Sequence, residues 1–310
     1  MEILSIILIL FGLSLFEIIT SIDNAIINAE ILSKMSEKAR KWFLLWGILF
    51  AVFVLRGLLP LIILWVGAPE LGFVGAFKAS FSSDPHVVEI IEGFKPVLLI
   101  AGGAFLILLF LHWIFMEPKH YGLRRIEDFI DNYEVWFFAF ASVFLMGIVY
   151  ASLIYMPWMA FGAVVGSTAF FITHGFKDNA EKQEGAMVEG KTSLSDTAMI
   201  LYLIMIDAIF SIDGVLGAFS FTVSIPLILI GNGIGAIFVR QITVGNIERI
   251  KKYKYLKNGA MYSILALGII MILDSFGVHI PEWVGPITTF LVVGYFFYKS
   301  YKEVKNGNVS

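Results

Sequence analysis

The sequence contains no cysteine, and only 15% of its 310 residues are charged. Without cysteine the chain cannot form disulfides, thiolate metal sites or a cysteine nucleophile. Soluble domains carry about 25% charged residues and about 45–50% apolar residues, whereas 58% of this chain is hydrophobic. The composition therefore excludes an ordinary soluble domain and predicts a polytopic membrane protein whose first partner is the lipid bilayer.

A strong excess of charge of either sign is also missing. The net charge of −3 gives no reason to expect a nucleic-acid partner. The N-terminus lacks the basic segment of a signal peptide, and its apolar run is longer than a signal peptide needs. We therefore expect the first apolar run to be a retained transmembrane helix.

Apolar runs of membrane-spanning length recur along the chain and predict a single transmembrane domain, an all-α bundle of about nine helices. The spans are expected at about 4–31, 42–66, 96–116, then two within 136–174 divided by Pro157, and finally 196–221, 226–244, 259–275 and 284–299. Residues 175–195 are expected to form a solvated cytoplasmic loop.

Lysine and arginine gather in alternate loops of this topology. With the N-terminus outside and the C-terminus inside, all the base-rich loops fall on the cytoplasmic side, as the positive-inside rule requires. The expected location is the plasma (inner) membrane. The Gly-rich stretch 67–94 has two interpretations, since its residues 71–81 either dip into the membrane or pack as a helix outside it.

Two acidic motifs stand inside the apolar runs, at a constant offset of 190 residues. They read Glu17-Ile-Ile-Thr-Ser21-Ile-Asp23-Asn24 and Asp207-Ala-Ile-Phe-Ser211-Ile-Asp213-Gly214. A carboxylate at the centre of a spanning helix costs roughly 2.5 to 3.5 kcal/mol, so such residues indicate function. The predicted topology makes the two motifs antiparallel. They therefore predict an inverted repeat, of helices one to three (about 4–116) and six to eight (about 196–275), with a binding site at the repeat interface.

A helical wheel divides the acids of each motif between two faces. Glu17, Ser21 and Asn24 share a polar stripe with Asn28, whereas Asp23 projects roughly 120° away. The second motif divides in the same way, with Asp213 off the face of Asp207. Either each helix unwinds, near 22–24 and near 212–214, or each outlying aspartate pairs with a second partner. Arg56 and Arg240, the intramembrane arginines, are the candidate charge partners.

Charge and ligand chemistry narrow the range of species that the site could bind. Glu17, Asp23, Asp207 and Asp213 together with two arginines leave a charge of −2, which one divalent cation would neutralise. Carboxylate oxygens, with Ser21, Asn24 and Ser211 completing the shell, are hard ligands suited to Mg²⁺, Ca²⁺ or Mn²⁺. The competing interpretation is purely structural: the acids pair with the arginines and link helices together.

The two motifs resemble those of the TerC family of integral membrane proteins, named from tellurium resistance, whose members include manganese exporters. Asp207 stands where that family usually has glutamate, and Gly214 where it usually has serine. The family is similar to the lysine-exporter superfamily in having three-helix inverted repeats. The resemblance implies a secondary transporter that exports a divalent cation, with Mn²⁺ as the first candidate, and we expect neither enzymatic activity nor a prosthetic group. From the paired acids we expect Glu17 and Asp207 to face each other across the repeat axis.

Other functions remain open from the residues. The acids would also suit an exporter of a basic amino acid or another organic cation, or the chain could be a non-transporting membrane scaffold. An intramembrane aspartyl protease is disfavoured because neither motif contains a Gly-x-Gly-Asp segment. His112 and His174 are expected to be interfacial residues near cytoplasmic helix ends.

Overall fold

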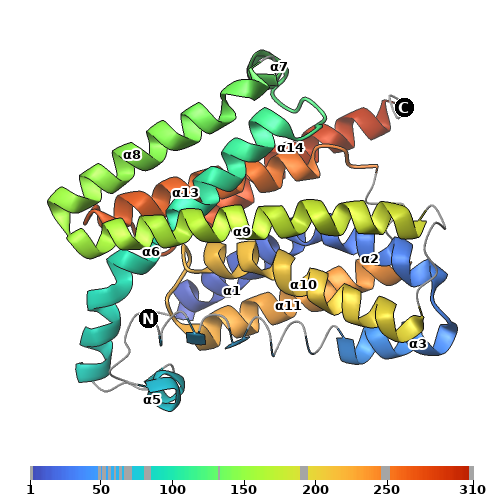
Figure 1. Ribbon diagram of the computed structural model, residues 1–310, viewed down its shortest axis with the longest axis horizontal. Helices are drawn as coiled ribbons and strands as arrows, with labels where there is room; N and C mark the ends of the chain where they lie inside the picture. The colour runs from blue at the N-terminus through green and yellow to red at the C-terminus, as the bar shows by residue number, and fades with distance from the viewer. Residues whose placement is uncertain are drawn as a thin grey trace.

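A computed structural model gives the arrangement of the chain. It describes residues 3–47, 72–79, 85–131, 133–188, 195–245 and 252–306, together with positions 50, 54, 57–58, 61–62 and 65. These residues form helices and connecting turns, and no strand occurs among them. The prediction of an all-α bundle is therefore confirmed (Figure 1).

The helices of the described residues are, in chain order, α1 (Ile3–Thr20), α2 (Ile22–Lys34), α3 (Glu37–Trp42), the π-helix η1 (Phe43–Gly47), α5 (Gly72–Ala79), α6 (Pro85–Met116), α7 (Arg124–Asp131), the 3₁₀-helix η4 (Glu134–Trp136), α8 (Phe137–Tyr155), α9 (Pro157–Val188), α10 (Asp196–Ala218), α11 (Ile225–Gly245), α13 (Leu256–Ser275) and α14 (Val284–Lys305).

Six of these helices are long and apolar enough to cross a membrane, and α11 contains a shorter apolar stretch. Their degree of burial distinguishes central helices from peripheral ones. In α6, 83% of the apolar window is buried inside the protein, whereas in α8 the share is 22%. Apolar side chains left exposed in such numbers need a lipid environment. Helix α6 is therefore the centre of the bundle, and α8 lies at its edge (Figure 1).

Helices α6 and α13 cross at a glycine contact. A Cβ built on Gly103 would lie 2.7 Å from the Ile272 side chain and 3.1 Å from the Gly268 carbonyl, and one on Gly268 would lie 3.1 Å from Ile107. Small residues at such a contact let two helix backbones approach closely. The contacts advance along α6 as they recede along α13, so the two helices are antiparallel.

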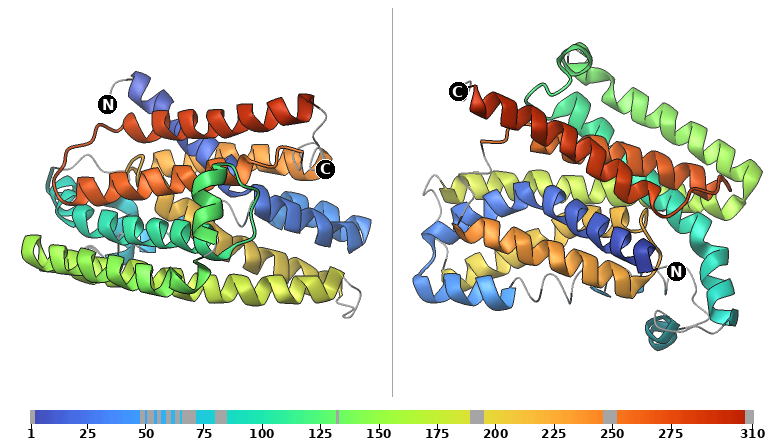
Figure 2. Two further views of the ribbon diagram at one scale, coloured as in Figure 1. Left: turned by 90° about the horizontal axis from the view of Figure 1, so that it is seen from above. Right: turned by 180° about the vertical axis from the view of Figure 1, so that it is seen from behind.

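Helix α1 lies beside α11 in the parallel sense (Figure 2). The Ser14 hydroxyl donates to the Gly231 carbonyl at 3.0 Å, and a Cβ on Gly235 would fall 2.6 Å from Cβ of Glu17. Against α10 the direction is reversed, because Phe16 contacts Gly217 while Asn28 contacts Asp207. These directions agree with the predicted alternation of spans. Antiparallel neighbours occur in any bundle of alternating helices, so the inverted repeat stays a prediction.

Each predicted span has a counterpart, apart from the second span, at about 42–66, which lies largely outside the described residues. Pro157 begins α9 and separates it from α8, as predicted. The third span begins earlier than expected, at Pro85, and α6 continues through Pro96. A proline inside a helix removes a backbone hydrogen bond and bends it, and Figure 1 shows α6 changing direction part-way along its length.

One stretch that the sequence left open is now described, and one further boundary differs from the sequence prediction. The stretch 67–94 contains the short helix α5, which Figure 1 shows beside one end of the bundle. The predicted cytoplasmic loop 175–195 is wrong over its first part, since α9 continues as helix to Val188. Its polar composition suggested a loop, but helix formers such as alanine, glutamate and lysine continue the α9 backbone beyond the apolar segment.

A pair of helix starts is joined at one end of the bundle. Ser36 caps α3, its hydroxyl accepting from the Ala39 amide at 3.3 Å. The amide of Ser36 also donates to Asp196 at 3.1 Å, and its hydroxyl donates to the same carboxylate. Asp196 is the first residue of α10, so this contact ties the end of the α2–α3 segment to the beginning of α10.

Candidate functional site

Glu17 is enclosed by three helices and is only 1% exposed. The Ser21 hydroxyl donates to its Oε1 at 2.6 Å. Gly235 of α11 leaves the room that the Glu17 side chain fills, and a Cβ on Gly214 of α10 would lie 3.2 Å from Oε2. A side chain at position 214 would therefore come into close contact with this carboxylate.

Asp207 forms a second buried acidic centre, on α10. The side chain is 6% exposed, and the Asn28 amide nitrogen donates to its Oδ1 at 3.0 Å. Seven residues of α10 separate Asp207 from Gly214, which lies opposite Glu17, so the two levels differ by about 10 Å along the helix. Glu17 and Asp207 therefore do not face each other directly, contrary to the expectation from the motif symmetry.

The predicted unwinding near residues 22–24 does not occur, because α2 is helical from Ile22 onward. In the first motif the helix is interrupted at Ser21, with φ −92° and ψ 0°, between α1 and α2. The interruption is slight, because the Ser21 amide still donates to the Glu17 carbonyl at 3.1 Å and the Ala25 amide to the Ser21 carbonyl at 2.9 Å. In the second motif α10 is continuous through residues 212–214, so no unwinding occurs there.

Asp213 instead has a second partner, Lys177 of α9, whose Nζ lies 2.6 Å from Oδ2. The expected partner Arg240 lies half-buried on α11, and no ion pair among the described residues joins it to Asp213. Lys177 was missed because the sequence placed it in a loop. The signal that could have found it is the helical continuation of α9, which carries a basic residue just past the apolar segment.

The remaining candidates lie where the structure gives only the backbone. Asp23 and Asn24 belong to α2, and Ser211 belongs to α10, but their side chains are outside the described part of the chain. Arg56 is outside the described residues altogether. The antiparallel contact of α2 with α10 nevertheless places the backbone of residues 23–24 between the levels of Gly214 and Asp207.

Three acidic centres thus run along the contact of α1 and α2 with α10. Glu17 is bound to Ser21, Asp207 to Asn28, and Asp213 to Lys177. No group of three histidine or acidic side chains that could hold a metal ion occurs within the described ranges. The three described carboxylates therefore lie at separate positions rather than in one cluster.

Several buried polar atoms near these acids have no hydrogen-bond partner among the described residues. They are Oδ1 of Asn28, Oδ1 of Asp213, and both amide atoms of Asn232, which follows the Ser14-bonded Gly231 on α11. A buried polar atom without a partner costs free energy comparable to a lost hydrogen bond. Such oxygens are suited to a hard cation or to water. The sequence did not single out Asn232 and named Asn28 only as part of the polar stripe.

The two histidines lie against each other rather than at an interface. His112 of α6 is 7% exposed, and its ring centroid lies 3.7 Å from that of His174 on α9. Glu117 lies beside this pair, 3.5 Å from Nδ1 of His112, and its other oxygen is 2.9 Å from Nζ of Lys257. The expectation of interfacial histidines is thus wrong for His112, which is packed between two helices.

Glu117 should make the stability of the protein depend on acidic pH. Burial raises the pKa of its carboxyl, but the His112 ring, 3.5 Å away, and the nearby Lys257 ammonium outweigh burial and lower the pKa from 4.5 to about 2. A depressed pKa contributes stability that is complete above pH 4.5 and is lost as the pH falls towards 2, up to about 3 kcal/mol in all. We expect Glu117→Gln to reduce the change of melting temperature with pH over this range in the purified protein.

The control for this measurement is Glu37→Gln, which removes an exposed carboxylate whose side chain is 78% accessible. Exposed pairs contribute little to stability, so this variant should follow the wild-type pH profile. If Glu117→Gln left the dependence of melting temperature on acidic pH unchanged, other groups would determine the loss of stability.

The fold and the buried acids together define a multi-pass, all-α membrane protein with carboxylates inside its helical bundle. The chain belongs to DUF475, a protein family of unknown function, whose model matches residues 22–307. The match includes the whole second motif and begins just after Glu17 and Ser21. No curated protein and no solved structure matches the chain.

Proposed function

We propose that this protein is a secondary transporter that exports a divalent metal cation from the cytoplasm, with Mn²⁺ as the first candidate. The observation that carries the proposal is the burial of Glu17 and Asp207, 1% and 6% exposed, inside apolar helices that pack antiparallel. Intramembrane acids of this kind are costly and mark ion paths. The proposal of export, and of Mn²⁺ as the cargo, is supported by the resemblance of the two motifs to those of the TerC family, whose members include manganese exporters.

The ligand chemistry supports a hard divalent cation. The side chains along the path supply carboxylate, hydroxyl and amide oxygens, and the sequence contains no thiolate that would favour a softer metal. Because the acids lie at different levels, we propose that the cation passes between them. Relative movement of the two repeats would expose first one acid and then the next, the general scheme of inverted-repeat transporters.

Metal-dependent thermal stability of the purified protein tests the proposal. A ligand that binds only the folded state stabilises it by about 2.7 kcal/mol at a concentration of 100 Kd. We expect Mn²⁺ to raise the melting temperature by several degrees and a chelator to reverse the change. Absence of a shift with Mn²⁺, Mg²⁺ and Ca²⁺ alike would contradict a divalent substrate.

One observation favours a second candidate, an exporter of a basic amino acid or another organic cation. The Lys177 ammonium already lies on Asp213 at 2.6 Å, so this carboxylate accommodates a primary amine. Free lysine is therefore the matched ligand in the same experiment. A melting shift with lysine and none with Mn²⁺ would assign the acids to an organic cation and overturn the metal proposal.

A further inference from the structure

The ion pair of Lys177 and Asp213 is largely withdrawn from solvent. The two side chains are 14% and 13% exposed, and Nζ of Lys177 lies 2.6 Å from Oδ2 of Asp213. The other carboxylate oxygen, Oδ1, is buried and has no hydrogen-bond partner among the described residues. Asp213 therefore has one oxygen taken by an ammonium and one oxygen left to accept a further ligand.

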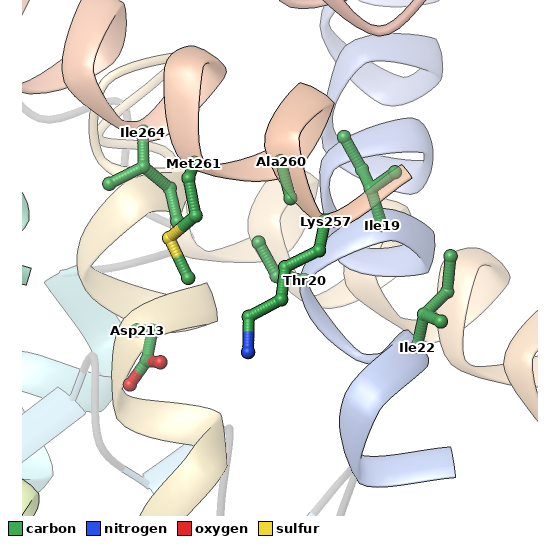
Figure 3. A pocket seen from close by; sticks show the side chains of 8 residues that line it. All are labelled: Ile19, Thr20, Ile22, Asp213, Lys257, Ala260, Met261 and Ile264. Carbon is green, nitrogen blue, oxygen red and sulfur yellow. The ribbon is translucent and has the colours of Figure 1, made fainter. Parts of the chain in front are cut away.

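A small pocket adjoins this pair, with about 30 Å³ of space, enough for a water molecule or a bare metal ion. Asp213 of α10 forms one wall, Thr20 at the end of α1 forms another, and the Lys257 side chain extends into the pocket from α13 (Figure 3). The rest of the lining is apolar, so Asp213, Thr20 and the ammonium of Lys257, which also pairs with Glu117 at 2.9 Å, are the polar groups of a space that joins three helices.

The location of the pocket connects it to one face of the bundle. The apolar segment of α9 ends at Lys177, that of α6 ends at Met116 next to Glu117, and α13 begins just before Lys257. These ends adjoin the base-rich loops, which the proposed topology places in the cytoplasm. Through Lys177, Asp213 is therefore connected to the ends of these helices, and its charge is already balanced by Lys177.

Simultaneous binding of a divalent cation and the Lys177 ammonium to Asp213 is unfavourable. Both would lie within a few ångströms of one carboxylate in a region largely withdrawn from water, where like charges repel strongly. A lysine has a flexible four-carbon stem that allows its charged head to move away from the carboxylate. Binding of the cargo at Asp213 therefore requires the ammonium to leave.

We propose that Lys177 is a tethered counter-cation of Asp213, which the cargo cation must displace and which returns when the cargo leaves. This inference rests on the proposed function and adds the residue that sets its affinity. Lys177 keeps the carboxylate neutralised in the cargo-free protein, so that the empty site does not hold a buried charge. It also weakens cargo binding, which favours release.

The test compares Mn²⁺ affinity among lysine variants of the purified protein, by calorimetry. We expect K177Q, which removes the competitor, to lower the apparent Kd at least tenfold. K177R keeps the charge and can bind the carboxylate with two parallel hydrogen bonds, so it should raise the Kd several-fold. The control K41Q breaks a Lys–Glu pair of the same 2.6 Å length on the exposed surface and should leave the Kd unchanged.

The double variant K177Q/D213N separates competition from a structural role. If Lys177 acts only through Asp213, the double variant binds Mn²⁺ no more tightly than D213N alone. Wild-type binding together with an unchanged or raised Kd in K177Q, or a lowered Kd in K177R, would overturn the inference and leave the proposed function intact. If neither wild type nor K177Q bound Mn²⁺, the proposed function would fall and the inference with it. Should K177Q not accumulate, the K177R arm still decides the question.

Discussion

Cells that depend on this protein for manganese export should lose protection when Glu17 is replaced by glutamine or Asp207 by asparagine. Each change keeps the shape of the side chain and removes a buried negative charge. Because each factor of ten in affinity corresponds to 1.4 kcal/mol, losing one charged ligand in a buried site should weaken binding by roughly a hundredfold or more. The measurement is manganese accumulation in a manganese-sensitive host, and both variants should match cells without the protein.

Glu37→Gln is the matched control, since it removes an exposed acid on α3 that pairs with Lys41 four residues later. It should protect the host like the wild type, and immunoblotting should confirm equal amounts of all three variants in the membrane. Full protection by both Glu17→Gln and Asp207→Asn would contradict the site. That result would favour a non-transporting scaffold in which the buried acids only link helices.

The second large effect concerns the packing of α9 against the central helix α6. A Cβ on Gly166 would lie 2.0 Å from the Ala101 carbonyl oxygen, which belongs to the backbone and cannot rotate away. Gly166→Ala must therefore push the two helices apart, at an expected cost of about 3 kcal/mol or more. We expect little folded protein, measured as a lost monodisperse peak in size-exclusion chromatography or a strongly reduced melting temperature.

The same helix supplies the control. Gly175 has no atom within 4 Å of its built Cβ, so Gly175→Ala should be neutral or should stabilise α9 by up to about 1 kcal/mol through helix propensity. Gly162, whose built Cβ lies 2.6 Å from the Val97 carbonyl, should fall between the two. Equal stability of the Gly166 and Gly175 variants would mean that α6 and α9 do not pack as described.

The buried acids of the site were predictable from sequence because their cost is local. Glu17 and Asp207 stand in apolar runs, and the recurrence of the acidic motif at a fixed offset argues against a chance occurrence. Helix directions followed from the alternation of basic loops. The levels of the acids were not predictable, since the register of α1 against α10 and α11 is set by contacts such as that of Gly235 with Glu17, which no local pattern reveals.

Lys177 illustrates a different limit of the sequence. Its neighbours are polar, and composition alone does not distinguish a solvated loop from a helix that continues beyond the membrane. Only the packing of α9 beside α10 brings Lys177 to Asp213. The arginine expected as a partner was a reasonable choice by charge, but a helical residue reaches only the neighbours that its own face meets.

The contact between Ser36 and Asp196 has a consequence for how the molecule can move. The contact joins Ser36, which follows the end of α2, to Asp196, the first residue of α10. Helices α2 and α10 are therefore coupled at that end. Sliding between them is restrained there. A change of shape that alters access to the acids would then keep these two ends together, and the Ser21 interruption between α1 and α2 is a place where the backbone departs from a regular helix.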